Sequence, residues 1–413
     1  QGRTPIEQMI FADEVQSAGF PLPFLTLNTV GPTIMKFGSD AIRNDFLPRI
    51  LAGDCHFCIG YSEPGAGTDL ASLTTKAVRD GDEWVINGQK VFTSLADFAD
   101  YVWLAARTDP NAPKHRGISM FIVPTTSPGF KLTPTFTMGD VRTNTTYYEN
   151  VRVPHGNLVG GENNGWGLIV SQLNHERVSL TPSGPSTRML EEVREWAKAT
   201  KLADGRRVID QPWVRDSLAW VHAKLEALRL MQWKLAWSLT QGALHPADAS
   251  AVKIYATELY VHAYRRLMEV LGPAGTVKDG SPGAICRGRL ERMYRATLIL
   301  TFGGGTNEVQ RDIVAMAGLG LPYELIFVED DSPAPLQELG APRWISPSLM
   351  SRTRCAKWRA KYWKPSARPT GCVRSRRATN ASTARCGRNS PRRTCSAPRF
   401  PKRMAAAATA SSN

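Results

Sequence analysis

The spacing of apolar residues divides the chain into regions of different secondary structure. Residues 5–19 carry apolar side chains at helical spacing, and residues 41–53 predict a second helix. From residue 56 to about residue 159 the pattern changes to short strands separated by turns. After Gly165 the helical spacing returns and is sustained. The pattern therefore predicts an α+β protein with a helical N-terminal part, a central β-domain and a C-terminal four-helix bundle.

Apolar spacing and cap residues locate the helices of the predicted bundle. Between Val214 and Leu228, apolar residues recur at spacings of four and three, which is typical of a helix face turned toward a core. Three further helices are predicted at residues 246–272, at residues 283–300, and after the glycines at 303–305, where Thr306 is the expected N-cap.

Two dipeptides in the β-region are typical of hairpin turns. Asp80-Gly81 and Asn87-Gly88 both combine a residue that tolerates positive φ with glycine. We therefore expect each of them to reverse the chain between two antiparallel strands.

The patterns together predict four segments along the chain. The expected segments are a truncated N-terminal helical domain at 1–55, the central β-domain at 56–164, the C-terminal bundle at 165–322 and an anomalous basic tail at 323–413. The chain begins with Gln rather than Met, so we expect it to start inside a longer gene product.

The charge of the chain is concentrated in its tail. Residues 341–413 contain 18 Lys and Arg residues and no Asp or Glu, whereas the whole chain carries a net charge of +14. The first 340 residues therefore carry −4, the difference between +14 and +18. A mildly acidic body does not support nucleic-acid binding. The tail fits a basic nucleic-acid arm, a disordered linker or a translation in the wrong frame, and its abrupt lack of acidic residues favours the last.

Cysteine content and hydropathy bear on the compartment. The first 340 residues contain three scattered cysteines, which argues against a disulfide scaffold and fits a reducing cytoplasm. No apolar run approaches the roughly 20 residues of a membrane-spanning helix, so no membrane partner is expected.

Cys55 and Cys58 have the spacing of redox and zinc sites. Residues three apart on a strand point to opposite faces, however, so we predict no metal site there.

A glycine-rich segment runs from Tyr61 to Asp69 with the sequence YSEPGAGTD. Two glycines beside serine and threonine hydroxyls form a tight turn that exposes backbone N–H groups to a ligand with many acceptors. Taken alone, the segment fits an ordinary connecting turn better than a ligand site.

Two further motifs change this interpretation. The motifs are NGQKVFTS at 87–94 and GGGTNEVQR at 303–311, and they follow the CIGYSEPGAGTD segment at 58–69. In this order and spacing, residues 1 to about 322 resemble the acyl-CoA dehydrogenase family. LNHERV at 173–178 and LTFGGGTNE at 300–308 resemble, more narrowly, actinobacterial subunits that act on steroid side-chain thioesters.

The resemblance implies an FAD site and a fold of helices, β-barrel-like domain and helices. It places the flavin against Tyr61, Ser62 and Thr68, with Thr306 as a further cofactor-binding residue. Phe92, Thr93 and Ser94 match the family's Trp-Ile-Thr segment, in which the aromatic ring covers one flavin face and the hydroxyl bonds the flavin N5. Phenylalanine in place of tryptophan keeps an apolar cover and loses an N–H donor.

The resemblance offers two places for the catalytic base that removes the substrate's α-proton. Many members carry a glutamate in a Tyr-Glu-Gly-Thr loop, but Gly304 occupies the matching position here. In other members the base lies on a bundle helix immediately before an arginine, which matches Glu176 before Arg177. A glutamate buried against flavin and thioester would have the raised pKa of a general base. Without the family context, Glu176 fits a surface helix residue paired with Arg177 or a lysine.

Main-chain groups next to the base complete the implied site. The backbone N–H of Gly304 would donate to the thioester carbonyl, as in an oxyanion hole. Two prolines and a glycine at 180–185 predict that the helix after Glu176 is kinked or shortened. The break fits either a wider pocket for a polycyclic acyl group or a plain helix end without functional meaning. His175 fits an ordinary helix histidine better than a second acid or base.

Family homotetramers reach across to the neighbouring flavin with an Arg-x-x-Phe-Gly segment and a Gln-x-x-Gly-Gly-x-Gly segment. Here residues 196–205 contain no such arginine motif, and Glu269 replaces the glutamine. The resemblance therefore implies an α2β2 complex with a homologous second subunit. The implied substrate is an acyl-CoA, the implied electron acceptor is an electron-transferring flavoprotein, and the reaction forms the 2,3-enoyl-CoA. A flavin monooxygenase of the same fold and a non-catalytic binding protein are the alternatives.

Overall fold

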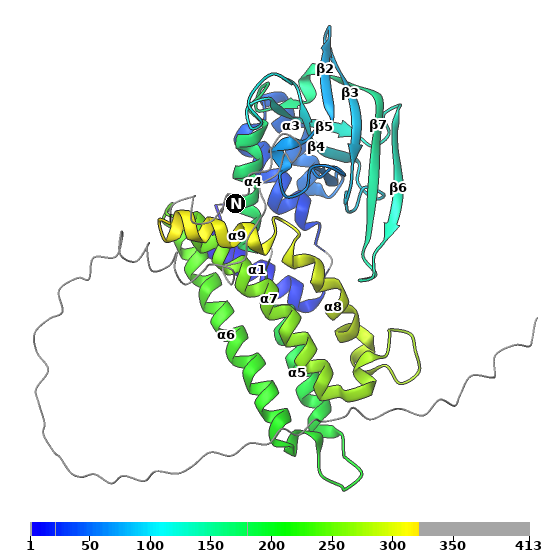
Figure 1. Cartoon of the computed structure of the whole chain (residues 1–413), viewed down its shortest axis with the longest axis vertical. Coiled ribbons are helices and arrows are strands. Elements are labelled where there is room, and N and C mark those ends of the chain that lie inside the picture. The colour runs from blue at the N-terminus through cyan, green and yellow to red at the C-terminus, as the bar shows by residue number, and fades with distance from the viewer. Residues whose placement is uncertain (1, 21, 180, 322–413) are drawn as a thin grey trace, which may run out of the picture. The chain divides into compact units, whose positions relative to one another are not determined.

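The computed structural model describes residues 2–20, 22–179 and 181–321, and it describes the backbone but not the side chains of residues 174–179. The basic tail predicted at 323–413 lies outside the described residues. Within them, the order of elements is helices, β-strands and helices, as the apolar pattern predicts (Figure 1). The predicted fold class is confirmed for this part of the chain.

The N-terminal part consists of short helices with local start and stop signals. The helices are α1 (Pro5–Ala18), α2 (Gly31–Phe37) and α3 (Asp40–Ala52). Thr4 and Glu7 form a reciprocal capping box at the start of α1, which ends at Gly19 with a φ of +73°. The Ser39 hydroxyl accepts from the N–H of Ile42 at the start of α3.

The central domain is one mixed sheet. Its strands are β1 (Phe57–Gly60), β2 (Lys76–Asp80), β3 (Glu83–Lys90), β4 (Tyr101–Arg107), β5 (Ile118–Pro124), β6 (Phe130–Phe136), β7 (Arg142–Pro154) and β8 (Leu158–Val159). The order across the sheet is β6-β7-β3-β2-β4-β5-β8, and β1 pairs in parallel with β4. The side chains of β4 and β5 are buried along nearly their whole length because apolar clusters cover both faces of these strands.

The structure confirms one predicted hairpin turn and contradicts the other. Gly81 has a φ of +62° and connects the antiparallel strands β2 and β3, as predicted. Asn87-Gly88, in contrast, lies inside β3 at an irregularity in its pairing with β7. A Cβ on Gly88 would lie 2.7 Å from Cα of Thr75. The glycine therefore serves a bulge and a close backbone approach, which the dipeptide does not distinguish from a turn.

The two cysteines of the Cys-x-x-Cys spacing lie in different apolar clusters. Cys55 packs with residues of the N-terminal helices, including Ile34 and Phe46, whereas Cys58 packs with Trp84 and other residues on the opposite face of the sheet. Burial raises the pKa of the Cys55 thiol to about 11 and that of Cys58 to about 12. Both thiols are therefore protonated side chains of the core and cannot converge on one ion.

The C-terminal part is a helical bundle. Its helices are α4 (Gly165–Ser179), α5 (Gly184–Ala199), α6 (Pro212–Thr240), α7 (Pro246–Leu271), α8 (Arg289–Thr297) and α9 (Asn307–Ile313). The predicted stripe from Val214 to Leu228 is buried on α6 and packs against α5 and α7. Thr306 caps α9, since its hydroxyl accepts from the N–H of Val309. No described helix is both long and apolar enough to cross a membrane.

Local sequence predicts one helix boundary of the bundle correctly and misses another. The prolines and glycine at 180–185 do break the helix, because α4 ends at Ser179 and α5 begins at Gly184. The single helix predicted at 283–300 is wrong. Cys286 and Arg287 adopt positive φ values of 52° and 54°, and a regular α-helix begins only at Arg289. The apolar spacing continues through this bend, so spacing alone does not reveal it.

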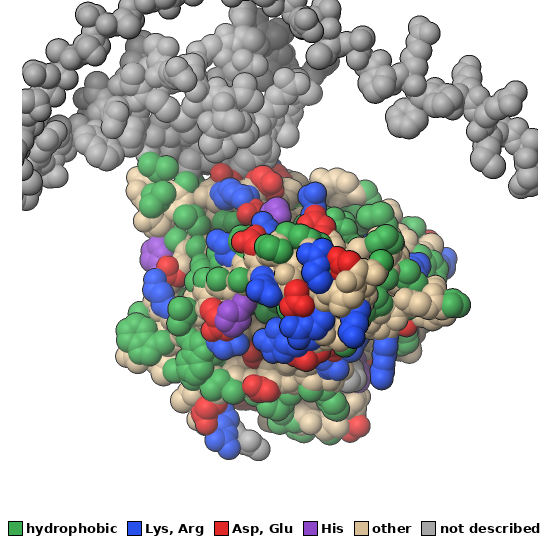
Figure 2. Space-filling model, turned by 90° about the horizontal axis from the view of Figure 1, so that it is seen from below, with side chains coloured by type: hydrophobic (Ala, Val, Ile, Leu, Met, Phe, Trp, Pro, Cys, Tyr) green, Lys and Arg blue, Asp and Glu red, His purple; other side chains and the backbone are tan. Residues whose placement is uncertain are grey.

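Charged side chains of both signs are interspersed on the face shown in Figure 2. Among the described residues, several charged side chains pair with a neighbour along one helix or within one loop, such as Arg207 with Asp210 at 2.9 Å. These pairs are solvent-exposed, so each contributes little to stability.

Candidate active site

The glycine-rich segment forms a tight turn with an open outer side. The N–H of Glu63 donates to the carbonyl of Ala66 at 2.9 Å, and the N–H of Ala66 donates back at 3.1 Å. A Cβ on Gly65 or Gly67 would meet no atom within 4 Å, and Thr68 is exposed. Protein packing therefore does not require these glycines. Their bare backbone leaves room for a ligand that approaches the main chain closely, as the phosphates and ribityl chain of a flavin nucleotide would.

A buried ion pair holds the backbone of this turn from the interior of the protein. The ammonium of Lys90 lies 2.8 Å from the carboxylate of Glu63 and donates to the carbonyl of Tyr61 at 3.0 Å. The backbone N–H groups of Thr74 and Thr75 also donate to Glu63. Burial raises the pKa of Glu63, but Lys90 and these hydrogen bonds outweigh it and lower the pKa to about 2. Burial lowers the pKa of Lys90 to about 8, against the opposing effect of Glu63.

The segment with Phe92, Thr93 and Ser94 lies beside the glycine-rich turn. The N–H of Val91 donates to the carbonyl of Ser62 at 2.8 Å, which brings two of the predicted flavin-contacting segments together. Phe92 has a φ of +57° and is 70% exposed, so its ring is free to cover a ligand. Thr93 is fully buried, and its hydroxyl lies 3.3 Å from that of Thr146. Ser94 is partly exposed and donates to the hydroxyl of Thr143.

Tyr61 lies at the same place, but its side chain points into the protein. It is 9% exposed, and its hydroxyl donates to Gln172 of α4 at 2.5 Å. The backbone of Tyr61 is thus the part that borders the turn. Sequence reasoning missed Gln172 because nothing in the local pattern of α4 distinguishes it from other polar helix residues.

A buried lysine holds the loop with three glycines. Lys253 of α7 is 1% exposed, and its ammonium donates to the carbonyls of Thr301 at 3.3 Å and Gly305 at 2.8 Å and to Oδ1 of Asn307 at 2.7 Å. Gly304 has a φ of +68° and stays exposed. Sequence reasoning also missed Lys253, although a lysine among the apolar positions of α7 was a signal.

Glu176 lies near the end of α4, where the structure describes the backbone only. Helix α4 packs against β5 of the central domain and against α7, the helix that holds the glycine loop through Lys253. The helix of Glu176 therefore contacts both the β-domain with the predicted flavin-contacting segments and the helix that anchors Gly304.

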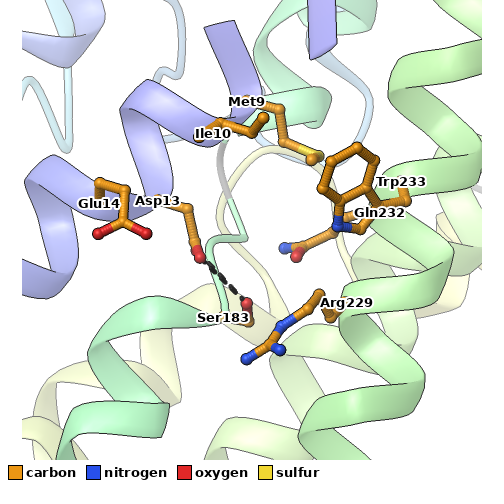
Figure 3. Close-up of a pocket in the computed structure, with 8 residues that line it drawn as sticks. All are labelled: Met9, Ile10, Asp13, Glu14, Ser183, Arg229, Gln232 and Trp233. Atoms are coloured by element: carbon orange, nitrogen blue, oxygen red, sulfur yellow. Dashed lines mark hydrogen bonds between the residues drawn. The ribbon is translucent and has the colours of Figure 1, made fainter. Parts of the chain in front are cut away.

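A cavity of about 320 Å³ lies at the break between α4 and α5. Figure 3 shows that side chains of α1 and α6 converge there with Ser183 from the break. The lining residues are Met9, Ile10, Asp13, Glu14, Ser183, Arg229, Gln232 and Trp233. Asp13 accepts from the N–H of Gly184 at 2.8 Å and so caps α5 from another helix. The side chain of Gln232 donates to the carbonyl of Thr181.

Glu269, the residue in place of the family glutamine, is exposed on α7. Nε of Arg265 lies 3.3 Å from its carboxylate. The negative charge is therefore partly compensated on its own helix, although an exposed pair of this kind is weak.

Comparison with known proteins decides the family. The family model for the acyl-CoA dehydrogenase middle domain matches residues 58–151, and that for the C-terminal domain matches residues 163–319. The chain belongs to the acyl-CoA dehydrogenase family. Acyl-CoA dehydrogenase FadE26 of Mycobacterium tuberculosis is 60% identical over 328 residues, which cover 78% of this chain and 82% of that protein. FadE29 of the same organism is 47% identical over 322 residues, with the same coverage of both chains.

Solved structures give the same result for the fold. A subunit of the ChsE4–ChsE5 complex from M. tuberculosis is 61% identical, with a TM-score of 0.75 over 78% of this chain and 84% of that one. The Tcur3481–Tcur3483 steroid ACAD is 53% identical, with a TM-score of 0.75 over 78% and 83% of the two chains. The chain is thus an acyl-CoA dehydrogenase, an oxidoreductase of a family whose members are flavoproteins.

Proposed function

We propose that this chain is the α-subunit of an FAD-dependent enzyme that converts a steroid side-chain CoA thioester to its 2,3-enoyl-CoA. The observation that carries the proposal is the glycine-rich turn with open space above Gly65 and Gly67, beside the exposed Phe92. The similarity to a steroid ACAD supports the substrate class. The free thiols of the described cysteines suit a reducing cytoplasm as the site of the reaction.

Cofactor binding and proton transfer would fall to different residues. The backbone of Tyr61 to Thr68, the ring of Phe92, the hydroxyl of Ser94 and the start of α9 at Thr306 would hold FAD. FAD bound there would supply the acceptor for the β-hydrogen of the substrate, which leaves as a hydride. Thr93 would contribute through its backbone position between Phe92 and Ser94, because its own hydroxyl is paired with that of Thr146 on β7.

The proton chemistry belongs to the chain itself. The N–H of Gly304 would donate to the thioester carbonyl and so make the α-proton more acidic. The carboxylate of Glu176 would accept that proton. The exposed Gly304 has no side chain to compete with Glu176 for this role.

Anaerobic mixing with a steroid side-chain CoA thioester tests this function directly. The flavin should lose its absorbance near 450 nm when about one equivalent of thioester has been added, since one thioester supplies the two electrons that reduce one flavin. The 2,3-enoyl-CoA should form in the same amount. A monooxygenase of this fold would leave its flavin oxidised under these conditions. An electron-transferring flavoprotein, the proposed acceptor, should then reoxidise the enzyme.

The assembly is expected to be a heteromer. The chain lacks the arginine segment and the glutamine that family homotetramers place on the neighbouring FAD, and Glu269 adds a carboxylate. A pyrophosphate without a cation is unfavourable. The similarity to the ChsE4–ChsE5 and Tcur3481–Tcur3483 complexes supports a homologous partner. We predict an α2β2 complex with one FAD per αβ pair on co-expression. A stable homotetramer with one FAD per chain, measured by flavin-to-protein ratio, would exclude this arrangement.

The cavity at the α4–α5 break is proposed to receive the bulky end of the acyl group. Its volume of about 320 Å³ lies in the range of small-molecule pockets, roughly 300–1,000 Å³. We predict that Ile10→Trp, which fills part of it, lowers kcat/KM for steroid thioesters on the order of tenfold or more and changes that for butyryl-CoA much less. Leu51→Trp, at an exposed position on α3, is the matched control. Equal losses for both substrates would remove the cavity from the acyl site.

A further inference from the structure

Three polar side chains from separate elements meet in the core between the β-domain and α4. Tyr61 follows β1, Trp103 lies on β4 and Gln172 lies on α4. The Tyr61 hydroxyl donates to Oε1 of Gln172 at 2.5 Å, and Nε1 of Trp103 donates to the same oxygen at 2.9 Å and to the Tyr61 hydroxyl at 3.2 Å. Trp103 and Gln172 are completely buried. Hydrogen bonds in such surroundings are strong and resist competition from water.

The chemistry of the donors determines how the Gln172 amide is oriented. An indole N–H can only donate, so the amide atom that faces Trp103 must be the oxygen. The Nε2 group then points away from both donors and has no hydrogen-bond partner among the described residues. A buried amide N–H₂ without a partner costs about 1–3 kcal/mol. Gln172 is therefore not optimised for stability, although an apolar side chain of similar size would in turn leave the Tyr61 hydroxyl without its acceptor.

The position of Gln172 gives the network a role in the reaction. Residue 172 lies one helical turn before residue 176 on α4. Tyr61 opens the glycine-rich turn, and its carbonyl accepts from Lys90. The network thus connects the turn proposed to hold FAD with the helix that carries the proposed base.

We propose that Gln172 is a positioning residue that sets the distance between the proposed base on α4 and the flavin-binding turn, through its hydrogen bonds to Tyr61 and Trp103. This inference rests on the proposed function. Proton and hydride leave opposite sides of the same Cα–Cβ bond, so the base and the flavin must be held in register. A misplacement of about 1 Å in such a site can cost roughly 10²-fold in rate.

The test is single-turnover flavin reduction by a steroid side-chain CoA thioester in the FAD-loaded complex. For Gln172→Met we expect a reduction rate roughly 10- to 100-fold below wild type, with a thioester dissociation constant within about threefold of wild type. The melting temperature should fall by no more than a few degrees, because loss of the unpaired N–H₂ group offsets the Tyr61 hydroxyl that is left without its acceptor. A large loss of rate at unchanged thioester affinity, measured where both proteins are fully folded, separates positioning from a merely structural role.

Two comparisons make the result specific. Ser171→Ala, on the same helix, removes a hydrogen bond to Lys36 of α2 and should keep the wild-type rate. Tyr61→Phe should slow flavin reduction, and the double variant with Gln172→Met should be no slower than the slower single variant, because both act through one hydrogen bond.

Additive losses in the double variant, or a wild-type rate for Gln172→Met, would overturn the positioning role while leaving the proposed function intact. A wild-type enzyme whose flavin is not reduced by the thioester would overturn the proposed function and, with it, this inference.

Discussion

Glu176→Gln should abolish most flavin reduction by the acyl-CoA thioester while FAD and thioester still bind. The amide keeps the size of the carboxylate but cannot accept the α-proton, and loss of a general base typically lowers the rate on the order of 10²–10⁴-fold. The prediction follows from the match of Glu176 and Arg177 to the family's base position and from glycine at 304. Anaerobic stopped-flow absorbance measures the rate, and equilibrium titration measures binding.

The neighbouring residue provides the control for this experiment. His175→Gln changes the adjacent position on the same helix and should leave flavin reduction within about threefold of wild type, since a residue outside the proton transfer does not contribute to the general-base effect. Flavin reduction at nearly the wild-type rate in Glu176→Gln would show that another group removes the α-proton. A large loss in His175→Gln alone would transfer that role to the histidine.

Lys90→Met should strongly destabilise the protein and weaken FAD binding. The substitution leaves the carboxylate of Glu63 without its cation in the core, and breaking a buried ion pair on one side costs about 3–5 kcal/mol. It also removes the donor to the carbonyl of Tyr61, so the proposed flavin turn loses its support. Urea unfolding and FAD titration at pH 7 would measure the two effects.

The pH dependence of this loss follows from the pKa of Glu63. In the wild type that pKa is lowered to about 2, so Glu63 contributes stability above its unfolded value of 4.5 and loses this contribution as the pH falls toward 2. In Lys90→Met, loss of the cation raises the pKa of the buried Glu63 carboxyl, so the variant gains stability relative to the wild type as this carboxyl becomes protonated. The difference between the two proteins should therefore shrink as the pH falls from 7 to 4.

An exposed pair in the same domain serves as the comparison. Lys131 lies 2.9 Å from Glu149, and both side chains are about two-thirds exposed. Lys131→Met should change the unfolding free energy little, because exposed pairs are worth little. Glu63→Gln in the Lys90→Met background should recover part of the lost stability, since it removes the unpaired charge. Equal effects of Lys90→Met and Lys131→Met would contradict the role assigned to the buried pair.

Local sequence signals predicted the parts of the fold that depend on neighbouring residues. The change from helical to strand spacing and back determined the order of the regions. Thr306 was identified as a cap because capping joins residues three positions apart. The prolines and glycine at 180–185 predicted the break after α4, since proline disrupts its own helix.

The motifs of the site were visible in the sequence, but their contacts were not. The resemblance named Tyr61, Thr93 and Gly304, and only the structure shows that the Tyr61 side chain and the Thr93 hydroxyl are turned into the protein. Asn87-Gly88 was mistaken for a turn because its partner at the close approach, Thr75, lies on a different segment.

The contacts that hold the candidate site together could not be predicted from the sequence for one physical reason. Gln172 and Lys253 each act on atoms at least 48 positions away along the chain. A charged residue among apolar positions marks Lys253, but no local pattern identifies partners that come together only when α4, α7 and the β-domain pack. The sequence alone therefore determined the order of the helical and strand regions and the chemical groups of the candidate site, whereas tertiary packing decided which side chains face the proposed ligand and which ones position it.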